Sequence, residues 1–252
     1  MFRKILYSLE EGIARITLNR PEKRNALDAA LVGELLRAAG DSAADENVRV
    51  VVIGGAGQDF CSGADLAALE QVSEAGVLGN IADARVMADL FVALRRHPRP
   101  VIAAVRGRAL AGGCGLATAC DVVLAAESAR FGYPEVNIGF VPAMVMAILR
   151  RSMSERAAFE LVATGEIVSA ARAREIGLVQ KVFADEIFDR EVAAYAANLA
   201  SKPASAVALT KGLLYQMDGL GFGAALDAGV QVNAIARMTE ECRAGVRRFL
   251  KK

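Results

Sequence analysis

The residues best suited to chemistry are the glycines within residues 106–121 and the carboxylate of Glu135 that follows them. The segment contains Gly112 and Gly113 just before a run of small residues that is typical of a helix start. Glycines at such a turn let another group approach the backbone, and the first N–H groups of a helix are unpaired and lie at the positive end of its dipole. The pattern therefore indicates a site for an anion or an oxyanion.

A second glycine-rich loop, residues 54–65, follows a run of β-branched residues at positions 48–53. Its glycine spacing matches neither the G-x-x-x-x-G-K-[ST] phosphate loop nor the G-x-G-x-x-G dinucleotide loop. Taken alone, an ordinary glycine-rich turn is an equally good interpretation of this segment.

The elements that must position these loops alternate between strands and helices. The patterns predict a hairpin at residues 3–9 and 12–18, a helix around 27–36, buried strands at 48–53, 101–105 and 121–126, a short strand at 129–131, and a helix ending before Pro98. Such alternation predicts an α/β fold with a mostly parallel sheet, in which ligands bind beyond the carboxyl ends of the strands. From residue 142 onward the composition predicts mainly helices, with a short extended piece at 178–183.

Composition excludes several classes of function. The chain of 252 residues fits one large domain, or one domain with a helical appendage. A net charge of +1 gives no reason to expect a nucleic acid partner, and no apolar run approaches the roughly 18 residues of a membrane span. We expect a cytoplasmic protein with no membrane partner.

Neither a metal site nor a Ser-His-Asp triad is expected. The single histidine, His97, lies in a proline-flanked segment that predicts a loop. A zinc site would usually include histidines, and the triad needs a histidine beside its nucleophile. The cysteines show no C-x-x-C spacing and are interpreted as reduced thiols; they are Cys61, Cys114, Cys120 and Cys242. Cys61 and Cys114 flank the predicted site, where small buried thiols are the favoured interpretation.

Several motifs, in one order along nearly the whole chain, resemble the crotonase family of enoyl-CoA hydratases and isomerases. They are Asn-Arg-Pro-Glu-Lys-Arg-Asn-Ala-Leu at 19–27, Phe-Cys-Ser-Gly-Ala-Asp-Leu at 60–66, the segment 100–114, Cys-Asp at 120–121, the segment 131–142, and the segments 161–166 and 173–179.

This resemblance implies a crotonase-like spiral of ββα turns with a C-terminal helical region that trimerises. The expected division is a spiral core at residues 1–195 and a helical region at 196–252 that also covers part of the active site. The expected partner is an acyl-CoA thioester, with CoA as part of the substrate and no cofactor or metal. The expected assembly is a homotrimer or a dimer of trimers.

The resemblance also assigns residues to the site. Ala64 and Gly112 match the two backbone N–H donors that stabilise a thioester enolate, which needs donors already fixed where charge develops. The substrate-binding residues implied for CoA and its thioester are Arg24, Ala26, Ala64, Asp65, Leu66, Ala67 and Gly112. Lys23 and Arg24 offer positive charge to phosphates, and solvated surface charge explains them equally well.

Family hydratases place two glutamates over the reacting bond. Glu135 matches the second of these, while the first falls on Gly115, which has no side chain. Because one glutamate is enough to move a proton between two carbons, the pattern favours isomerase-type chemistry with Glu135 as the acid and base. The structural alternative for Glu135 is an ion pair with a basic neighbour.

Other reactions stay open on the sequence alone. Members related to methylglutaconyl-CoA hydratases can carry glycine at the position of Gly115, and another group would then position water. Candidates for that role are Tyr133, Glu70 and Glu74. Decarboxylation or thioester hydrolysis would use the same oxyanion hole, and a catalytically silent acyl-CoA-binding protein would retain the pocket without turnover.

Overall fold

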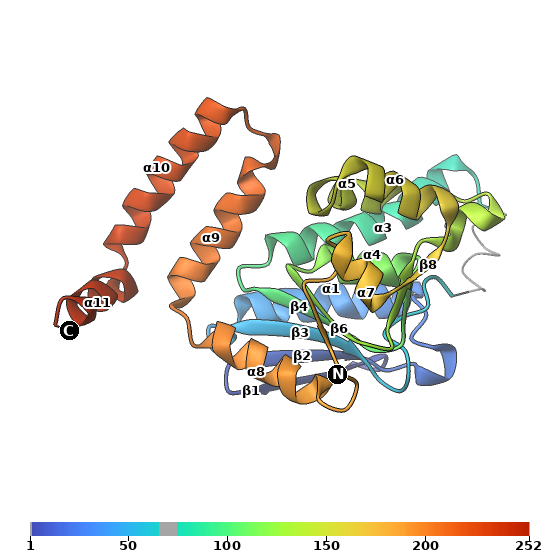
Figure 1. Ribbon diagram of the computed structural model, residues 1–252, viewed down its shortest axis with the longest axis horizontal. Helices are drawn as coiled ribbons and strands as arrows, with labels where there is room; N and C mark the ends of the chain where they lie inside the picture. The colour runs from blue at the N-terminus through green and yellow to red at the C-terminus, as the bar shows by residue number, and fades with distance from the viewer. Residues whose placement is uncertain (1, 66–74, 252) are drawn as a thin grey trace.

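The computed structural model describes residues 2–65 and 75–251, and its core is built on a six-stranded sheet (Figure 1). The strand order is β1-β2-β3-β4-β6-β9. The strands are β1 (Ile5–Glu10), β2 (Ile13–Leu18), β3 (Val50–Gly55), β4 (Val101–Val105), β6 (Val122–Ala126) and β9 (Lys181–Phe183). β1 and β2 form the predicted antiparallel hairpin, and every other neighbouring pair is parallel. The prediction of a mostly parallel α/β sheet is confirmed.

A second, smaller sheet contains β5 (Arg108–Leu110), β7 (Arg130–Gly132) and β8 (Ile167–Ser169). After β4 the chain enters β5 and then a helix, and after β6 it enters β7 and then further helical segments. Each of these turns therefore gives one strand to each sheet before its helix, as expected for a ββα spiral. The sequence pattern does not predict β5 or β8, because three residues are too few to show the period-two pattern of a strand.

Helices cover both faces of the larger sheet. Apolar residues alternate along β3, so Val50 and Val52 face α8 (Phe188–Ala200), whereas Val51 and Ile53 belong to the core under α1 (Ala29–Ala44). In Figure 1, α8 lies below the strands, and α1, α3 (Val77–Arg96) and α4 (Gly112–Ala119) lie above them. The other core elements are the 3₁₀ helices η1 (Pro21–Lys23) and η2 (Pro134–Ile138), and α5 (Ala143–Ser152), α6 (Glu155–Thr164) and α7 (Ala170–Glu175).

The C-terminal helices extend away from this core (Figure 1). They are α9 (Ala204–Gln216), the 3₁₀ helix η3 (Met217–Gly219), α10 (Phe222–Met238) and α11 (Glu240–Phe249). The helical region predicted at 222–249 is divided at Thr239, whose side chain caps α11 by accepting the N–H of Cys242 at 3.3 Å. The predicted boundary at residue 195 lies within α8, and the division into two units stays a prediction. Among the described residues, no helix combines the length and apolar character that a membrane span requires.

A buried ion pair fastens α9 to the core. The Nζ atom of Lys211 on α9 lies 2.7 Å from Oδ2 of Asp121, and it also donates to the carbonyl oxygens of Leu94 and Arg99 at 3.0 and 3.1 Å. The hydroxyl of Tyr215 donates to Oδ1 of the same aspartate at 2.6 Å. Lys211 is 8% exposed, and the desolvation lowers its pKa despite the opposing effect of Asp121. The helices from α9 to α11, called the C-terminal arm below, are therefore attached to the core through the buried ammonium group of Lys211, whose hydrogen bonds all go to protein oxygens.

Replacing Lys211 by methionine is expected to lower the free energy of unfolding by about 3 kcal/mol, because Asp121 would be left as a buried charge without its cation. Urea titration of both proteins measures the change. Lys202→Met is the matched control, since that lysine is exposed, and we expect it to alter stability by less than about 0.5 kcal/mol. Equal stability of the two variants would contradict a role for the pair.

The histidine of the chain is buried beside this ion pair. His97 follows α3, is 4% exposed, and lies 3.1 Å from Ser42 Oγ through Nε2. Its Nδ1 lies 3.0 Å from the backbone nitrogen of Arg99 and 3.1 Å from the carbonyl oxygen of the same residue. Burial is the largest cause that lowers the pKa of His97 to about 4, and the nearby cation of Lys211 also lowers it. The loop predicted around His97 is present, and the imidazole side chain is buried in the core.

Protein stability is expected to fall as pH decreases from 6.5 to about 4, the ordinary and the lowered pKa of His97. In this window the unfolded chain binds a proton that the folded chain excludes, so folding is disfavoured by up to about 3 kcal/mol at the acid end. NMR titration of the imidazole measures the pKa directly, and because the chain has one histidine the signal is unambiguous. A pKa near 6.5 in the folded protein would contradict the neutral, buried ring.

Candidate active site

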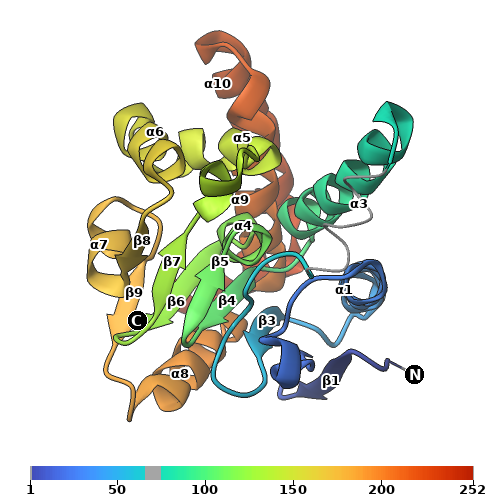
Figure 2. The same cartoon turned by 90° about the vertical axis from the view of Figure 1, so that its right-hand side faces the viewer.

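Three parallel segments bring the predicted site together. β5 pairs with β7 in register from Arg108–Arg130 to Leu110–Gly132. On the other side of β5, Cys61 forms a parallel bridge with Ala109, and its N–H and C=O groups bond to residues 108 and 110 at 2.9 and 3.0 Å. Figure 2 shows β5 and β7 next to each other, with α4 at their end.

All three segments leave this small sheet at the same end. The chain continues from Cys61 to Ala64, from β5 to Gly112, and from β7 to Glu135. The backbone N–H of Ala111 also donates to the carbonyl of Gly132 at 2.9 Å, which ties the start of α4 to the segment that leads to Glu135. The pairing register therefore directs three residues that are far apart in the sequence toward the same end of the small sheet.

The two predicted donor segments are in contact. A Cβ atom placed on Gly63 would lie 2.8 Å from Cβ of Ala111 and 3.7 Å from the nitrogen of Gly112, and Gly63 has a φ of +101°. A side chain at this position would therefore be strained and would clash. Ala64 is exposed and Gly112 is half-buried, and among the described residues neither N–H donates to a backbone carbonyl. These two N–H groups are the predicted donors, and no backbone carbonyl of the described residues occupies either of them.

The start of α4 holds an unusual backbone conformation. Ala111 has φ 49° and ψ −127°, in a region that residues with a Cβ rarely adopt. Its N–H bonds to Gly132, and its carbonyl accepts the N–H of Gly115 at 2.9 Å. These bonds hold the turn between β5 and the first residues of α4.

A polar clamp fixes the loop that carries Ala64. Arg20, 8% exposed, donates through Nη2 to Oδ2 of Asp65 at 2.8 Å and through Nη1 to the carbonyl of Ala26 at 2.6 Å. Its backbone N–H donates to Oδ1 of Asn25 at 2.9 Å, and Nδ2 of this fully buried asparagine reaches two carbonyl oxygens of the second loop at 2.9 and 2.8 Å. Arg20 and Asn25 belong to the motif at residues 19–27, but the sequence alone predicts no role for either.

The predicted CoA residues of residues 19–27, called the first loop below, lie against those of the second loop at residues 54–65. The carbonyl of Arg24 accepts the N–H of Ser62 at 3.0 Å, and Leu27 exchanges backbone bonds with Gly63 and Asp65 at 2.7 and 2.9 Å. Arg24 is exposed, whereas Ala26 and Asp65 are buried. The remaining predicted residues of this site, Leu66 and Ala67, lie outside the described residues, as do Glu70 and Glu74.

Glu135 lies at the start of η2 with a carboxylate that is partly desolvated. Oε2 is buried and has no hydrogen-bond partner among the described residues. Desolvation is the largest cause that raises the pKa of Glu135, and a hydrogen bond from its own backbone acts in the opposite direction. Within the described part of the chain, no ion pair joins Glu135 to a basic side chain, so the structural alternative for this residue is not observed there.

Tyr133 is fully buried, and its hydroxyl lies 2.8 Å from Oγ1 of Thr118 on α4. Burial also raises the pKa of Cys61 to about 12 and that of Cys114 to about 11. The tyrosine hydroxyl is therefore engaged inside the protein, which disfavours it as the group that positions water, and the two cysteines are buried, protonated thiols as predicted.

The place where a second carboxylate would start is filled by an aromatic ring. A Cβ atom on Gly115 would lie 2.9 Å from Cζ of Phe91 on α3. Phe91 is 6% exposed. The absence of a side chain at Gly115 is therefore matched by a large side chain on the neighbouring helix.

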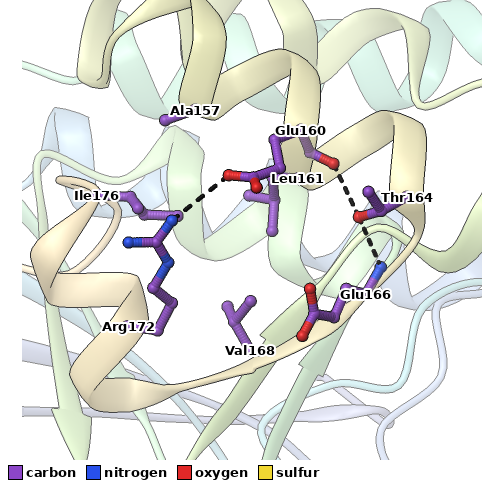
Figure 3. A pocket seen from close by; sticks show the side chains of 8 residues that line it. All are labelled: Ala157, Glu160, Leu161, Thr164, Glu166, Val168, Arg172 and Ile176. Carbon is purple, nitrogen blue, oxygen red and sulfur yellow. Dashed lines mark hydrogen bonds and ion pairs between the residues drawn. The ribbon is translucent and has the colours of Figure 1, made fainter.

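A separate surface pocket of about 210 Å³ lies between α6, β8 and α7 (Figure 3). It is lined by Ala157, Glu160, Leu161, Thr164, Glu166, Val168, Arg172 and Ile176. Arg172 crosses one side to reach Glu160 at 3.4 Å. The pocket shares no residue with the predicted site. No group of three or more potential metal ligands of the His, Cys, Asp and Glu types occurs among the described residues.

Comparison with known proteins identifies the family. The family model described as enoyl-CoA hydratase/isomerase matches residues 8–252. The chain belongs to the enoyl-CoA hydratase/isomerase family. It is 40% identical over 248 residues to a putative enoyl-CoA hydratase of Thermus thermophilus, covering 98% of both chains. It is 35% identical over 254 residues to the 2,3-dehydroadipyl-CoA hydratase of Escherichia coli, covering 99% of this chain and 96% of that protein.

Solved structures confirm the crotonase-like fold of this family member. An enoyl-CoA hydratase of Mycobacterium smegmatis matches with a TM-score of 0.94 and 36% identity, covering 99% of this chain and 96% of the other. The human enoyl coenzyme A hydratase domain-containing protein 3 matches with a TM-score of 0.93 and 30% identity, covering 99% and 98%. The family prediction made from the spaced motifs is confirmed.

Proposed function

We propose that this protein is an acyl-CoA enzyme that forms a thioester enolate and moves one proton with Glu135. The observation that supports this most directly is the desolvated, unpartnered carboxylate oxygen of Glu135, at the same end of the small sheet as Ala64 and Gly112. A carboxylate with a raised pKa is a better proton acceptor than an ordinary glutamate.

The reaction that this arrangement fits best is double-bond isomerisation of a 3-enoyl-CoA thioester. The N–H groups of Ala64 and Gly112 would donate to the thioester carbonyl oxygen. The Glu135 carboxylate would take a proton from the α-carbon, and the C–H electron pair would pass into a dienolate whose negative charge rests on that oxygen. Glu135 would then return the proton to the γ-carbon, which leaves the double bond conjugated with the thioester and regenerates the carboxylate.

Hydration of a 2-enoyl-CoA thioester is the second candidate, and the name of the 35% identical 2,3-dehydroadipyl-CoA hydratase favours it. Water would have to add its oxygen to the β-carbon and a proton to the α-carbon. Gly115 offers no side chain to hold that water, so another group would be needed. For this reason we rank hydration below isomerisation.

We further propose that the first loop, through Arg24 and Ala26, and the second loop, through Ala64 to Ala67, bind the CoA portion. The C-terminal arm is proposed to assemble the chain into a trimer or a dimer of trimers, because its helices expose large apolar side chains that water solvates poorly. These include Leu214, Phe222, Leu226, Val230, Phe249 and Leu250.

A substrate comparison tests the proposal. Purified protein is mixed with short-, medium- and long-chain 3-enoyl-CoA and 2-enoyl-CoA thioesters, and the products are separated by chromatography and identified by mass. We expect conversion of 3-enoyl to 2-enoyl thioesters, with much slower formation of 3-hydroxyacyl thioesters. Rapid hydration would favour the second candidate, and release of CoA or of carbon dioxide would indicate hydrolysis or decarboxylation. Binding of CoA thioesters without any turnover would overturn the proposal.

A further inference from the structure

Phe91 is placed where it determines what can occupy the space beside Gly115. Three atoms at the far end of its ring lie 2.9, 3.6 and 3.7 Å from the position of a Cβ on that glycine. Real Cβ atoms essentially never lie closer than 3.0 Å to another heavy atom, so a side chain at Gly115 requires the ring or its surroundings to shift. Because the ring belongs to the packed core between α3 and α4, its movement is opposed by its neighbours.

The same face of α3 continues as an apolar wall over the start of α4. Met87 precedes Phe91 by four residues and therefore lies on the same side of the helix. Its Cε is 4.0 Å from the Cβ position of Gly112, and Cδ1 of Leu27 is 3.4 Å from the same point. The atoms nearest to the Cβ position of Gly112 in these directions are methyl carbons of Leu27 and Met87, which offer no hydrogen bond to a water molecule.

We propose that Phe91 is a specificity-determining residue that selects proton transfer over hydration. This inference rests on the proposed thioester-enolate function. The ring lies against the point where a second carboxylate side chain would begin, and in this proposal it keeps that side of the reacting bond apolar. Glu135 is then left to remove and return a proton without a bound water molecule to compete for the reacting carbons.

A four-member variant cycle tests the packing part of this inference without any substrate. It compares wild type, Gly115→Glu, Phe91→Leu and the double variant by thermal unfolding. Leucine lacks the distal ring atoms that approach Gly115 and still fills part of the core. We expect Gly115→Glu alone to lower the unfolding temperature, and Phe91→Leu to recover part of that loss. If Gly115→Glu lowers the unfolding temperature equally with and without Phe91→Leu, the inference is overturned. Met87→Leu combined with Gly115→Glu is the control, and we expect it to recover none of the lost unfolding temperature.

The activity part uses the ratio of hydration to isomerisation for one pair of enoyl-CoA thioesters. We expect this ratio to rise at least tenfold in Phe91→Leu/Gly115→Glu and to stay near the wild-type value in Phe91→Leu/Gly115→Gln, which has the same size without the carboxylate. The inference is overturned if the double variant folds and the ratio does not rise, if Gly115→Glu alone raises it equally, or if the wild type already hydrates as fast as it isomerises. Wild-type protein inactive on both thioesters would overturn the proposed function instead, and the thermal cycle would still decide whether Phe91 excludes a side chain from position 115.

Discussion

Replacing Glu135 by glutamine is expected to lower kcat for isomerisation by about 10²- to 10⁴-fold. Glutamine has nearly the same size and can occupy the same space at the start of η2, but its amide cannot accept and return a proton. KM is expected to change little, because the carboxylate acts on the transition state more than on the bound substrate. Steady-state rates with a 3-enoyl-CoA thioester give both constants.

Glu127→Gln is the matched control, since that glutamate is exposed and lies outside the site. The pH dependence adds a second measurement. Because the pKa of Glu135 is raised by desolvation, the carboxylate form is lost at a higher pH than for an ordinary glutamate, and kcat/KM should fall correspondingly early as the solution is acidified. A variant that keeps wild-type kcat would remove Glu135 from the mechanism.

Replacing Gly112 by proline is expected to lower kcat by about 10²- to 10³-fold, the effect of losing one oxyanion donor. Gly112 is the first residue of α4, a position where proline is well tolerated because its fixed φ suits the helix and its missing N–H breaks no helical bond. The change therefore removes the donor without removing a helical hydrogen bond. Circular dichroism and the unfolding temperature verify the fold, and steady-state kinetics measure the loss.

Gly112→Ala separates the donor from the space around it. The added methyl group would meet Leu27 at 3.4 Å and Met87 at 4.0 Å, which the site can accept with a small adjustment, and the N–H is kept. We expect this variant to retain most of its activity. If alanine and proline lower kcat equally, the loss comes from the added carbon atoms, and the N–H of Gly112 does not stabilise the enolate.

The sequence predicted the larger elements of the fold because their patterns are long. β3 is a run of β-branched residues buried on both faces, and the hairpin of β1 and β2 alternates in the way the structure shows. Ser154 caps α6 in the way serine favours, with its Oγ accepting the N–H of Ala157 at 3.2 Å. The short strands β5 and β8 could not be predicted in the same way, since pairing with distant segments defines them more than local pattern does.

The candidate site was predictable in its residues but not in its packing. Glu135 and the glycines can be recognised in the sequence by their residue types and spacing. The missing carboxylate at Gly115 is also visible in the sequence. The ring of Phe91 beside Gly115, the clamp from Arg20 to Asp65, and the ion pair of Lys211 with Asp121 join residues 24, 45 and 90 positions apart. Contacts between such distant positions depend on the tertiary fold, which a single sequence does not specify locally.

The central claim, that one carboxylate carries the proton between two carbons, is tested most directly by isotope transfer. A 3-enoyl-CoA thioester dideuterated at the α-carbon is converted in ordinary water, and the product is analysed by mass and by NMR for deuterium at the γ-carbon. If Glu135 takes and returns the same proton beside the apolar wall of Phe91, a substantial fraction of the label appears at the γ-carbon. Product whose γ-carbon carries only solvent hydrogen would contradict the account.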